Sequence, residues 1–278
     1  MNHDQEEFWD ASAGPAWVAL QGQMDALIQP VLDLVLERAG LRPGERVLDI
    51  GCGTGASVLQ ALDQVGDRGH VTGVDIAASM LELAKGRLGG RANVDLLKSD
   101  AQTHVFTTDY DALISRFGVM FFADTTAAFA NMARALAPGG RIICAAWGPA
   151  PHNPWFMEPA GAAADVLGSM PKVDRTEPGP FAFEDAARTC ALLQAAGLED
   201  IQATQIDLHL TPLGDLSQAA DLCCQIGPAD RALRHHEANP AQRRAVADRI
   251  AARFAQYQEG DNLRIPASIN LFTARKST

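Results

Sequence analysis

Residues 46–55 read RVLDIGCGTG, and this stretch decides the fold. Its first half is apolar and partly β-branched, which predicts a strand buried on both faces of a sheet. Three glycines then alternate with other residues, and such spacing permits an unusual turn and lets a ligand approach bare backbone. The glycines are Gly51, Gly53 and Gly55. Residues 56–65 follow with apolar side chains at helical spacing, so a strand, a turn and a helix open a nucleotide-binding βαβ unit.

Asp49, two positions before the first glycine, distinguishes between two classes of cofactor. Gly51, Gly53 and Ala56 would also satisfy a dinucleotide fingerprint. A carboxylate at position 49 would oppose a pyrophosphate, however, and would attract a cation. The D-x-G-x-G-x-G string resembles the cofactor motif of the class I S-adenosylmethionine-dependent methyltransferases. That cofactor carries a sulfonium and an ammonium group and no phosphate.

Segments of strand and helix character alternate after the glycine turn. Further strands are expected at 70–76, 94–99, 110–115, 141–147, 201–210 and 265–274, and helices at 77–88, 125–136 and 183–196. The resemblance covers most of this alternation. It implies an α/β, Rossmann-like, doubly wound sheet of seven strands, in which the last strand is antiparallel and lies between its neighbours.

Three pieces lie outside this plan. Residues 1–40 are expected to form a helical lid, in which Pro30 breaks an amphipathic helix at 24–39. Residues 41–278 then form the methyltransferase domain, with cap insertions at about 148–180 and 213–262. The first insertion is too rich in proline to be one regular element. The lid and the insertions are expected to cover the carboxyl ends of the strands, where open α/β sheets bind ligands.

Composition limits the partners. A net charge of −11 argues against nucleic acid, which would require a basic face. No run approaches the roughly 18 apolar residues of a membrane span, and the N-terminus is acidic without a hydrophobic signal core, so a cytoplasmic protein is expected. The five cysteines show no C-x-x-C spacing and indicate reduced thiols rather than disulfides or zinc. No metal is expected, and a homodimer is left open.

The resemblance also assigns cofactor residues. Asp75, 20 positions beyond Gly55, matches the acidic residue that accepts both ribose hydroxyls, and Asp100 with Ala101 matches the pair that reads the adenine edge. The remaining expected contacts are Ile76 and Met80 on the adenine ring, Cys52 as a small residue of the turn, Arg116 and Phe117 beside the methionine part, and Trp17 from the lid, where residues 8–21 fold back over the site.

The acceptor site is assigned to the cap. Its aromatic residues suit a small, apolar or aromatic metabolite, and the expected substrate contacts are Trp155, Phe156, Phe181 and Tyr257. The region after residue 115 lacks an Asn/Asp-Pro-Pro-aromatic string and resembles methyltransferases of quinone precursors and secondary metabolites. His152 is the candidate general base, although an electrophilic cofactor need not require one. The identity of the methylated atom stays open among O, N, S and C.

Two other functions are weighed against methyl transfer to such a metabolite. A nicotinamide-dependent oxidoreductase lacks a usual proton donor here, because the residues four positions after the two tyrosines are Ile114 and Asp261, so no Tyr-x-x-x-Lys pair exists. A non-catalytic S-adenosylmethionine-binding protein is the second alternative. The aromatic insertions favour a substrate chamber over that function.

Overall fold

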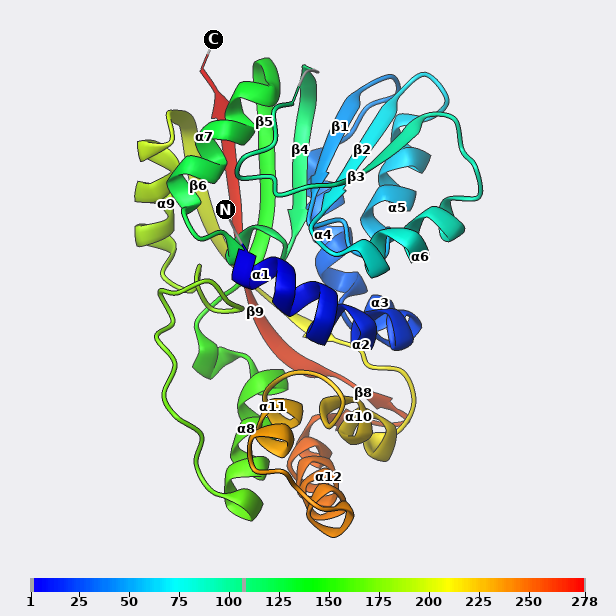
Figure 1. Cartoon of the computed structure of the whole chain (residues 1–278), viewed down its shortest axis with the longest axis vertical. Helices are drawn as coiled ribbons and strands as arrows, with labels where there is room; N and C mark the ends of the chain where they lie inside the picture. The colour runs from blue at the N-terminus through cyan, green and yellow to red at the C-terminus, as the bar shows by residue number, and fades with distance from the viewer. Residues whose placement is uncertain (1–2, 107–108, 278) are drawn as a thin grey trace.

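The computed structural model describes residues 3–106 and 109–277 and shows one seven-stranded sheet with a helical cap below it (Figure 1). The first two residues of the predicted lid and the last residue of the chain lie outside the described ranges. The sheet has the order β3-β2-β1-β4-β5-β9-β6. Its strands are β1 (Arg46–Ile50), β2 (His70–Asp75), β3 (Val94–Lys98), β4 (Tyr110–Arg116), β5 (Leu136–Trp147), β6 (Leu198–Leu210) and β9 (Ile265–Lys276).

The strand directions follow the predicted plan. The five strands β1 to β5 are parallel, whereas β9 runs antiparallel to both β5 and β6, between which it lies. The central strand β1 carries Val47, Leu48 and Ile50 in the core because neighbours flank it on both edges. The predicted Rossmann-like fold with an antiparallel last strand is confirmed.

Helices pack along the sheet. They are α4 (Gln29–Ala39), α5 (Ala56–Val65), α6 (Ala78–Leu88), α7 (Thr125–Ala135) and α9 (Ala186–Ala195). Each contacts the strands it connects or their neighbours. The helix expected at 24–39 is interrupted as predicted, because the preceding helix ends at Leu27 and Pro30 stands in the first turn of α4.

Two differences from the sequence prediction have a physical cause. Strand β5 begins at Leu136, not at Arg141, because Pro138-Gly139-Gly140 forms a bulge against β4 rather than a turn before the strand. The proline-rich insertion contains a regular 14-residue helix, α8 (Pro154–Leu167). Its interior Pro159 is tolerated where the surrounding packing outweighs one lost backbone hydrogen bond.

The cap consists of four helices and a small hairpin. They are α8, α10 (Leu216–Cys223), α11 (Pro228–His235), α12 (Pro240–Phe254), β7 (Gln258–Glu259) and β8 (Asn262–Leu263). The four helices pack on one another, and Trp155 of α8 stacks on Phe254 of α12 with ring centroids 5.8 Å apart. Strands β6 and β9 continue out of the sheet into this cap (Figure 1).

The N-terminal segment, residues 3–27, lies between the sheet and the cap. It contains α1 (His3–Glu7), a π-helix (Phe8–Ala13), α2 (Gly14–Ala19) and α3 (Gln21–Leu27). These short helices cross beneath the carboxyl ends of the parallel strands (Figure 1). Ligands of open α/β sheets bind at that edge, so the segment covers the expected site. No helix in the described ranges has the length and apolarity that a bilayer span requires.

Candidate functional site

The glycine turn after β1 has the geometry that its sequence predicts. Gly51, Gly53 and Gly55 have φ values of 69°, 53° and 87°, in the left-handed region that disfavours side chains. A Cβ at Gly51 would lie 2.6 Å from Cα of Gly118, so the ends of β1 and β4 approach too closely for any larger residue. The turn therefore leaves bare backbone facing the edge of the sheet.

Asp75 ties this turn to the end of β2. Gly53 N–H donates to its Oδ2 at 2.8 Å, and Ala77 N–H donates to its Oδ1 at 2.9 Å. Burial raises the pKa of Asp75, although the hydrogen bonds from backbone N–H groups oppose the change. Met80, one turn into α6, places its sulfur 3.9 Å from where a Cβ of Gly53 would lie. Gly53, Asp75 and Met80, three of the predicted cofactor residues, thus lie close together, and Ile76 follows Asp75 directly in the chain.

Asp49 is a buried carboxylate with one oxygen unsatisfied. Its side chain is 1% exposed, and Ser57 donates to Oδ2 at 2.5 Å. Within the described residues Oδ1 has no hydrogen-bond partner. Burial raises the pKa of Asp49 to about 7. A buried carboxyl group in this state favours a cation or a hydrogen-bond donor beside Oδ1.

Arg116 presents the complementary charge at the end of β4. Its side chain is 10% exposed, and burial lowers its pKa. Asp25 pairs with it at a loose 4.0 Å, while the same carboxylate pairs with Arg87 at 2.8 Å. Asp49 lies opposite Ile114 in the β1–β4 register, so Arg116 follows two residues further along the adjacent strand. The strand ends therefore offer one buried anion and one incompletely paired buried cation.

The loop after β3 places the predicted Asp100–Ala101 pair at the same edge. Gln102 N–H donates to Oδ1 of Asp100 at 2.9 Å, and Ala101 is buried. Asn131 of α7 fixes the loop by donating to the carbonyl oxygens of Ala101 and His104 at 2.9 and 2.7 Å. Asn131 was not predicted as a site residue from the sequence, although a polar residue on the apolar face of α7 was a usable signal.

The N-terminal segment is attached directly to this edge. Ala78 N–H, at the start of α6, donates to Oδ1 of Asp10 at 2.7 Å, and Lys98 pairs with Oδ2 of Asp10 at 3.0 Å. The Trp9 ring contacts both Phe121 and Trp17, with centroids 5.2 and 6.3 Å apart. Asp10 thus supplies the cap that α6 lacks in its own sequence. This role of Asp10 could not be predicted from local sequence, because its partner is 68 residues away.

A series of aromatic rings leads from the cofactor side into the cap. Phe117, held at φ 67°, stacks on Trp147 with centroids 4.2 Å apart and an interplanar angle of 9°. Phe156 lies edge-on to Trp147 at 4.9 Å, and Phe181 lies edge-on to Phe156 at 5.0 Å. A predicted cofactor residue and two predicted substrate residues are thereby brought together. Trp147, which links them, was read only as the end of a strand.

The other predicted acceptor residues lie elsewhere. Trp155 is buried against Phe254 inside the cap, and the Tyr257 hydroxyl donates to Oε1 of Glu158 at 3.4 Å. His152 is exposed at the end of a short 3₁₀ turn, Ala150–His152. The structure therefore does not bring these three side chains into the aromatic series that begins at Phe117.

Comparisons with known proteins agree with this geometry. Residues 47–140 match a family model described as "Methyltransferase domain". Aklanonic acid methyltransferase DauC of Streptomyces sp. (strain C5) is 42% identical over 102 residues, which are 36% of this chain and 46% of that protein. Demethylmenaquinone methyltransferase of Staphylococcus aureus (strain JH9) is 35% identical over 111 residues, 40% of this chain and 46% of that protein. The matched part thus spans about half the length of these curated relatives.

Solved structures share the fold over more of the chain. The YcgJ protein of Bacillus subtilis superimposes with a TM-score of 0.55 at 19% identity, covering 89% of this chain and 98% of that one. The [4+2]-cyclase SpnF gives 0.55 at 23% identity, with 90% and 81% coverage. The glycine turn, the acidic residues at the strand ends, the strand order and the matched domain together lead to one assignment. Residues 47–140 match a methyltransferase domain, and the chain has the fold of the class I S-adenosylmethionine-dependent methyltransferases.

Proposed function

We propose that this chain transfers the methyl group of S-adenosylmethionine to a small aromatic or apolar metabolite by direct displacement, with S-adenosylhomocysteine as the product. The observation that carries the proposal is the unsatisfied Oδ1 of buried Asp49 beside the glycine turn. An ammonium group at this oxygen would satisfy it and favour the ionised carboxylate. Arg116, loosely paired at 4.0 Å, suits the carboxylate of the same amino-acid moiety. The two groups together fit the zwitterionic end of the cofactor.

The rest of the edge fits the nucleoside. Asp75 keeps acceptor capacity for ribose hydroxyls, because its two oxygens offer about four lone-pair sites and accept the backbone N–H groups of Gly53, Ala77 and Ile76. Ile76 and Met80 lie beside it for contact with the adenine ring, and Asp100 with Ala101 would read the ring's polar edge. Gly51, Gly53 and Gly55 have no side chains that could stand between the turn and the ligand. Cys52 is a buried small residue of this turn.

The chemistry needs little from the protein beyond placement. The cofactor supplies a methyl group that its sulfonium makes electrophilic, so the chain's own task is binding, alignment and exclusion of water. The N-terminal segment serves the last purpose, since Trp9 and Trp17 lie over the strand ends and Asp10 anchors them on α6. A dedicated set of catalytic side chains is therefore not required. His152, exposed as it is, would act as a base only if the acceptor needs to lose a proton.

The aromatic series supports the acceptor class. Phe156 and Phe181 form a wall with Trp147, which stacks on Phe117 beside the cofactor end. Flat apolar molecules bind well to such walls. Trp155 and Tyr257 are proposed to act on the acceptor through the packing of α8, which presents Phe156. The names of two relatives, aklanonic acid methyltransferase and demethylmenaquinone methyltransferase, also point to small-molecule acceptors.

Methyl transfer requires a direct test, because the [4+2]-cyclase SpnF has the same fold. We propose titrating the purified chain with S-adenosylhomocysteine and with NAD in a calorimeter, followed by methyl-transfer assays on phenols, amines, thiols and carboxylic acids. Binding of S-adenosylhomocysteine alone and methylation of a small molecule support the proposal. Binding without turnover on any acceptor indicates a non-catalytic protein, and activity confined to nucleic acid or protein rejects the acceptor class.

A further inference from the structure

A surface pocket of about 510 Å³ lies where the N-terminal segment meets the cap. Its volume is within the range of sites for small molecules, roughly 300–1,000 Å³. Three apolar residues and three basic residues line it: Phe8, Met170, Pro171, Arg231, Arg234 and His235. The function proposed above makes no use of this pocket.

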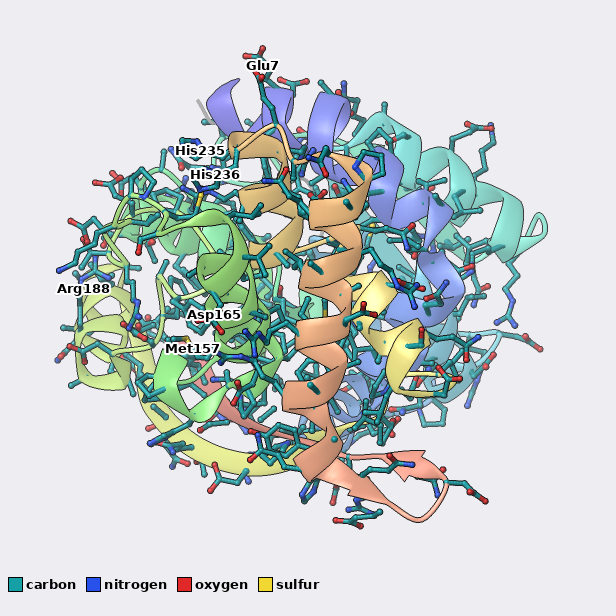
Figure 2. All side chains as sticks on the ribbon, turned by 90° about the horizontal axis from the view of Figure 1, so that it is seen from below. Glu7, Met157, Asp165, Arg188, His235 and His236 are labelled. Carbon is teal, nitrogen blue, oxygen red and sulfur yellow. The ribbon has the colours of Figure 1, made fainter. Side chains whose placement is uncertain are left out.

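The basic residues share one face of α11. Positions 231, 234 and 235 are three and four residues apart, which places their side chains together on a helix. Arg234 pairs with Asp230, whereas Arg231 has no carboxylate partner within residues 3–106 and 109–277. In Figure 2 His235 lies next to His236, and Glu7 at the end of α1 projects outward from the molecule. The face of α11 that carries Arg231 and Arg234 is therefore locally basic, although the whole chain has a net charge of −11.

The apolar side of the pocket leads toward the strand ends. Phe8 is 46% exposed in the pocket, and its ring lies edge-on to Trp9 at 5.4 Å. Trp9 in turn contacts Phe121, just after β4, at 5.2 Å. Two ring contacts thus link the pocket through packed side chains to Phe121, three residues after Gly118.

We propose that this pocket binds the anionic end of the methyl acceptor, so that the preferred substrates are aromatic molecules with a carboxylate. The role of the bound molecule as methyl acceptor rests on the proposed function. Binding of an aromatic carboxylate to the pocket does not require the cofactor. Arg231 supplies the unpaired charge, and the planar guanidinium group suits a carboxylate geometrically. Phe8, Met170 and Pro171 hold the apolar part next to it.

The test compares two probes of the same shape, 2-naphthoate and 2-naphthamide, by calorimetry without cofactor. Wild type should bind the acid at least tenfold more tightly, which is the lower end expected for one charge-assisted hydrogen bond. Arg231→Gln should remove that preference, while Phe8→Ala should weaken both probes. Arg244→Gln, which removes an exposed arginine of α12 outside the pocket, is the matched control and should change neither. Equal binding of acid and amide, or an unchanged Arg231→Gln variant, overturns the inference.

A second measurement separates this inference from the proposed function. S-adenosylhomocysteine affinity should be the same in wild type and Arg231→Gln, because the pocket lies outside the glycine turn. For any carboxylate acceptor found active, Arg231→Gln should raise KM about tenfold or more and leave kcat unchanged, as expected for lost ground-state binding. An unchanged KM would show that the pocket does not belong to the acceptor site. Failure of wild type to bind S-adenosylhomocysteine would instead reject the proposed function and leave the probe result standing.

Discussion

Replacing Asp49 by Asn should make the protein more stable at pH 8 and weaken its hold on the cofactor. The substitution keeps the shape of the side chain and an oxygen that can accept the hydrogen bond from Ser57, which donates at 2.5 Å. It removes the negative charge that burial disfavours and that the cofactor's ammonium group would use. Stability and binding should therefore change in opposite directions.

The magnitude follows from the pKa of Asp49, about 7 against an ordinary value of 3.8. The folded chain holds this proton more tightly than the unfolded chain does. The free energy of unfolding therefore falls as the pH rises from about 3.8 to 7, by up to about 4 kcal/mol. An Asn amide leaves an unsatisfied donor in place of Oδ1, which costs about 1–3 kcal/mol at any pH. Asp49→Asn should thus exceed wild type by about 1–3 kcal/mol at pH 8 and fall below it near pH 4.

Urea unfolding at pH 4, 6 and 8 measures the stability, and calorimetry with S-adenosylhomocysteine measures the affinity. In wild type, affinity should rise by about tenfold from pH 6 to pH 8 as Asp49 ionises, and in Asp49→Asn it should be lower by about 10- to 100-fold at pH 8. Asp63→Asn removes an exposed carboxylate from the next helix and serves as the control. A variant that is destabilised equally at every pH, or that binds as tightly as wild type, would refute this account of Asp49.

Four further outcomes are expected. Asp75→Ala should weaken S-adenosylhomocysteine binding by about 1.5–3 kcal/mol in calorimetry, and undiminished affinity would contradict its ribose role. Asp10→Asn should speed amide hydrogen exchange across residues 8–21, and ligand should restore protection; equal exchange in all samples would mean ordinary packing. Phe156→Ala should raise KM for aromatic acceptors more than it lowers kcat in steady-state assays, whereas an unchanged KM would remove it from the acceptor wall. His152→Ala should lower kcat by no more than roughly 10²–10⁴-fold and hardly at all for acceptors already ionised, so a larger loss would require another role.

The parts of the site that the sequence predicted are local in the chain. The β1 turn, Asp75 and the Asp100–Ala101 pair each follow a strand directly, and strand ends in a parallel sheet meet at one edge. Their placement therefore needs only the strand assignment and the strand order. The bulge at 138–140 was missed because a Pro-Gly-Gly sequence indicates a change of backbone direction without saying whether pairing continues through it.

The parts that were missed depend on contacts between distant residues. Asp10 caps a helix 68 residues away, and Trp147 stacks on Phe117 through the left-handed conformation at Phe117. Neither the partner nor the rotation of a ring is encoded in spacing along the chain. Trp155 illustrates the same limit, since an aromatic residue of the cap is as well suited to the interior of the cap as to its ligand-facing side.

The way the cap leaves the sheet has a consequence for how such a protein can change its substrate. Leu210, the last residue of β6, is the cross-strand partner of Ile265, the first residue of β9. Everything from 211 to 264 therefore enters and leaves between two residues only about 5 Å apart. The ends of an ordinary hairpin loop are the same distance apart. Residues 211–264 are therefore an insertion that can be lengthened, shortened or exchanged while the pairing of β6 with β9 stays in register. The basic side of the surface pocket, which includes Arg231, can then change by replacement of one contiguous piece of chain. The cofactor edge and the aromatic wall of Phe156 and Phe181 lie outside that piece and stay unaltered.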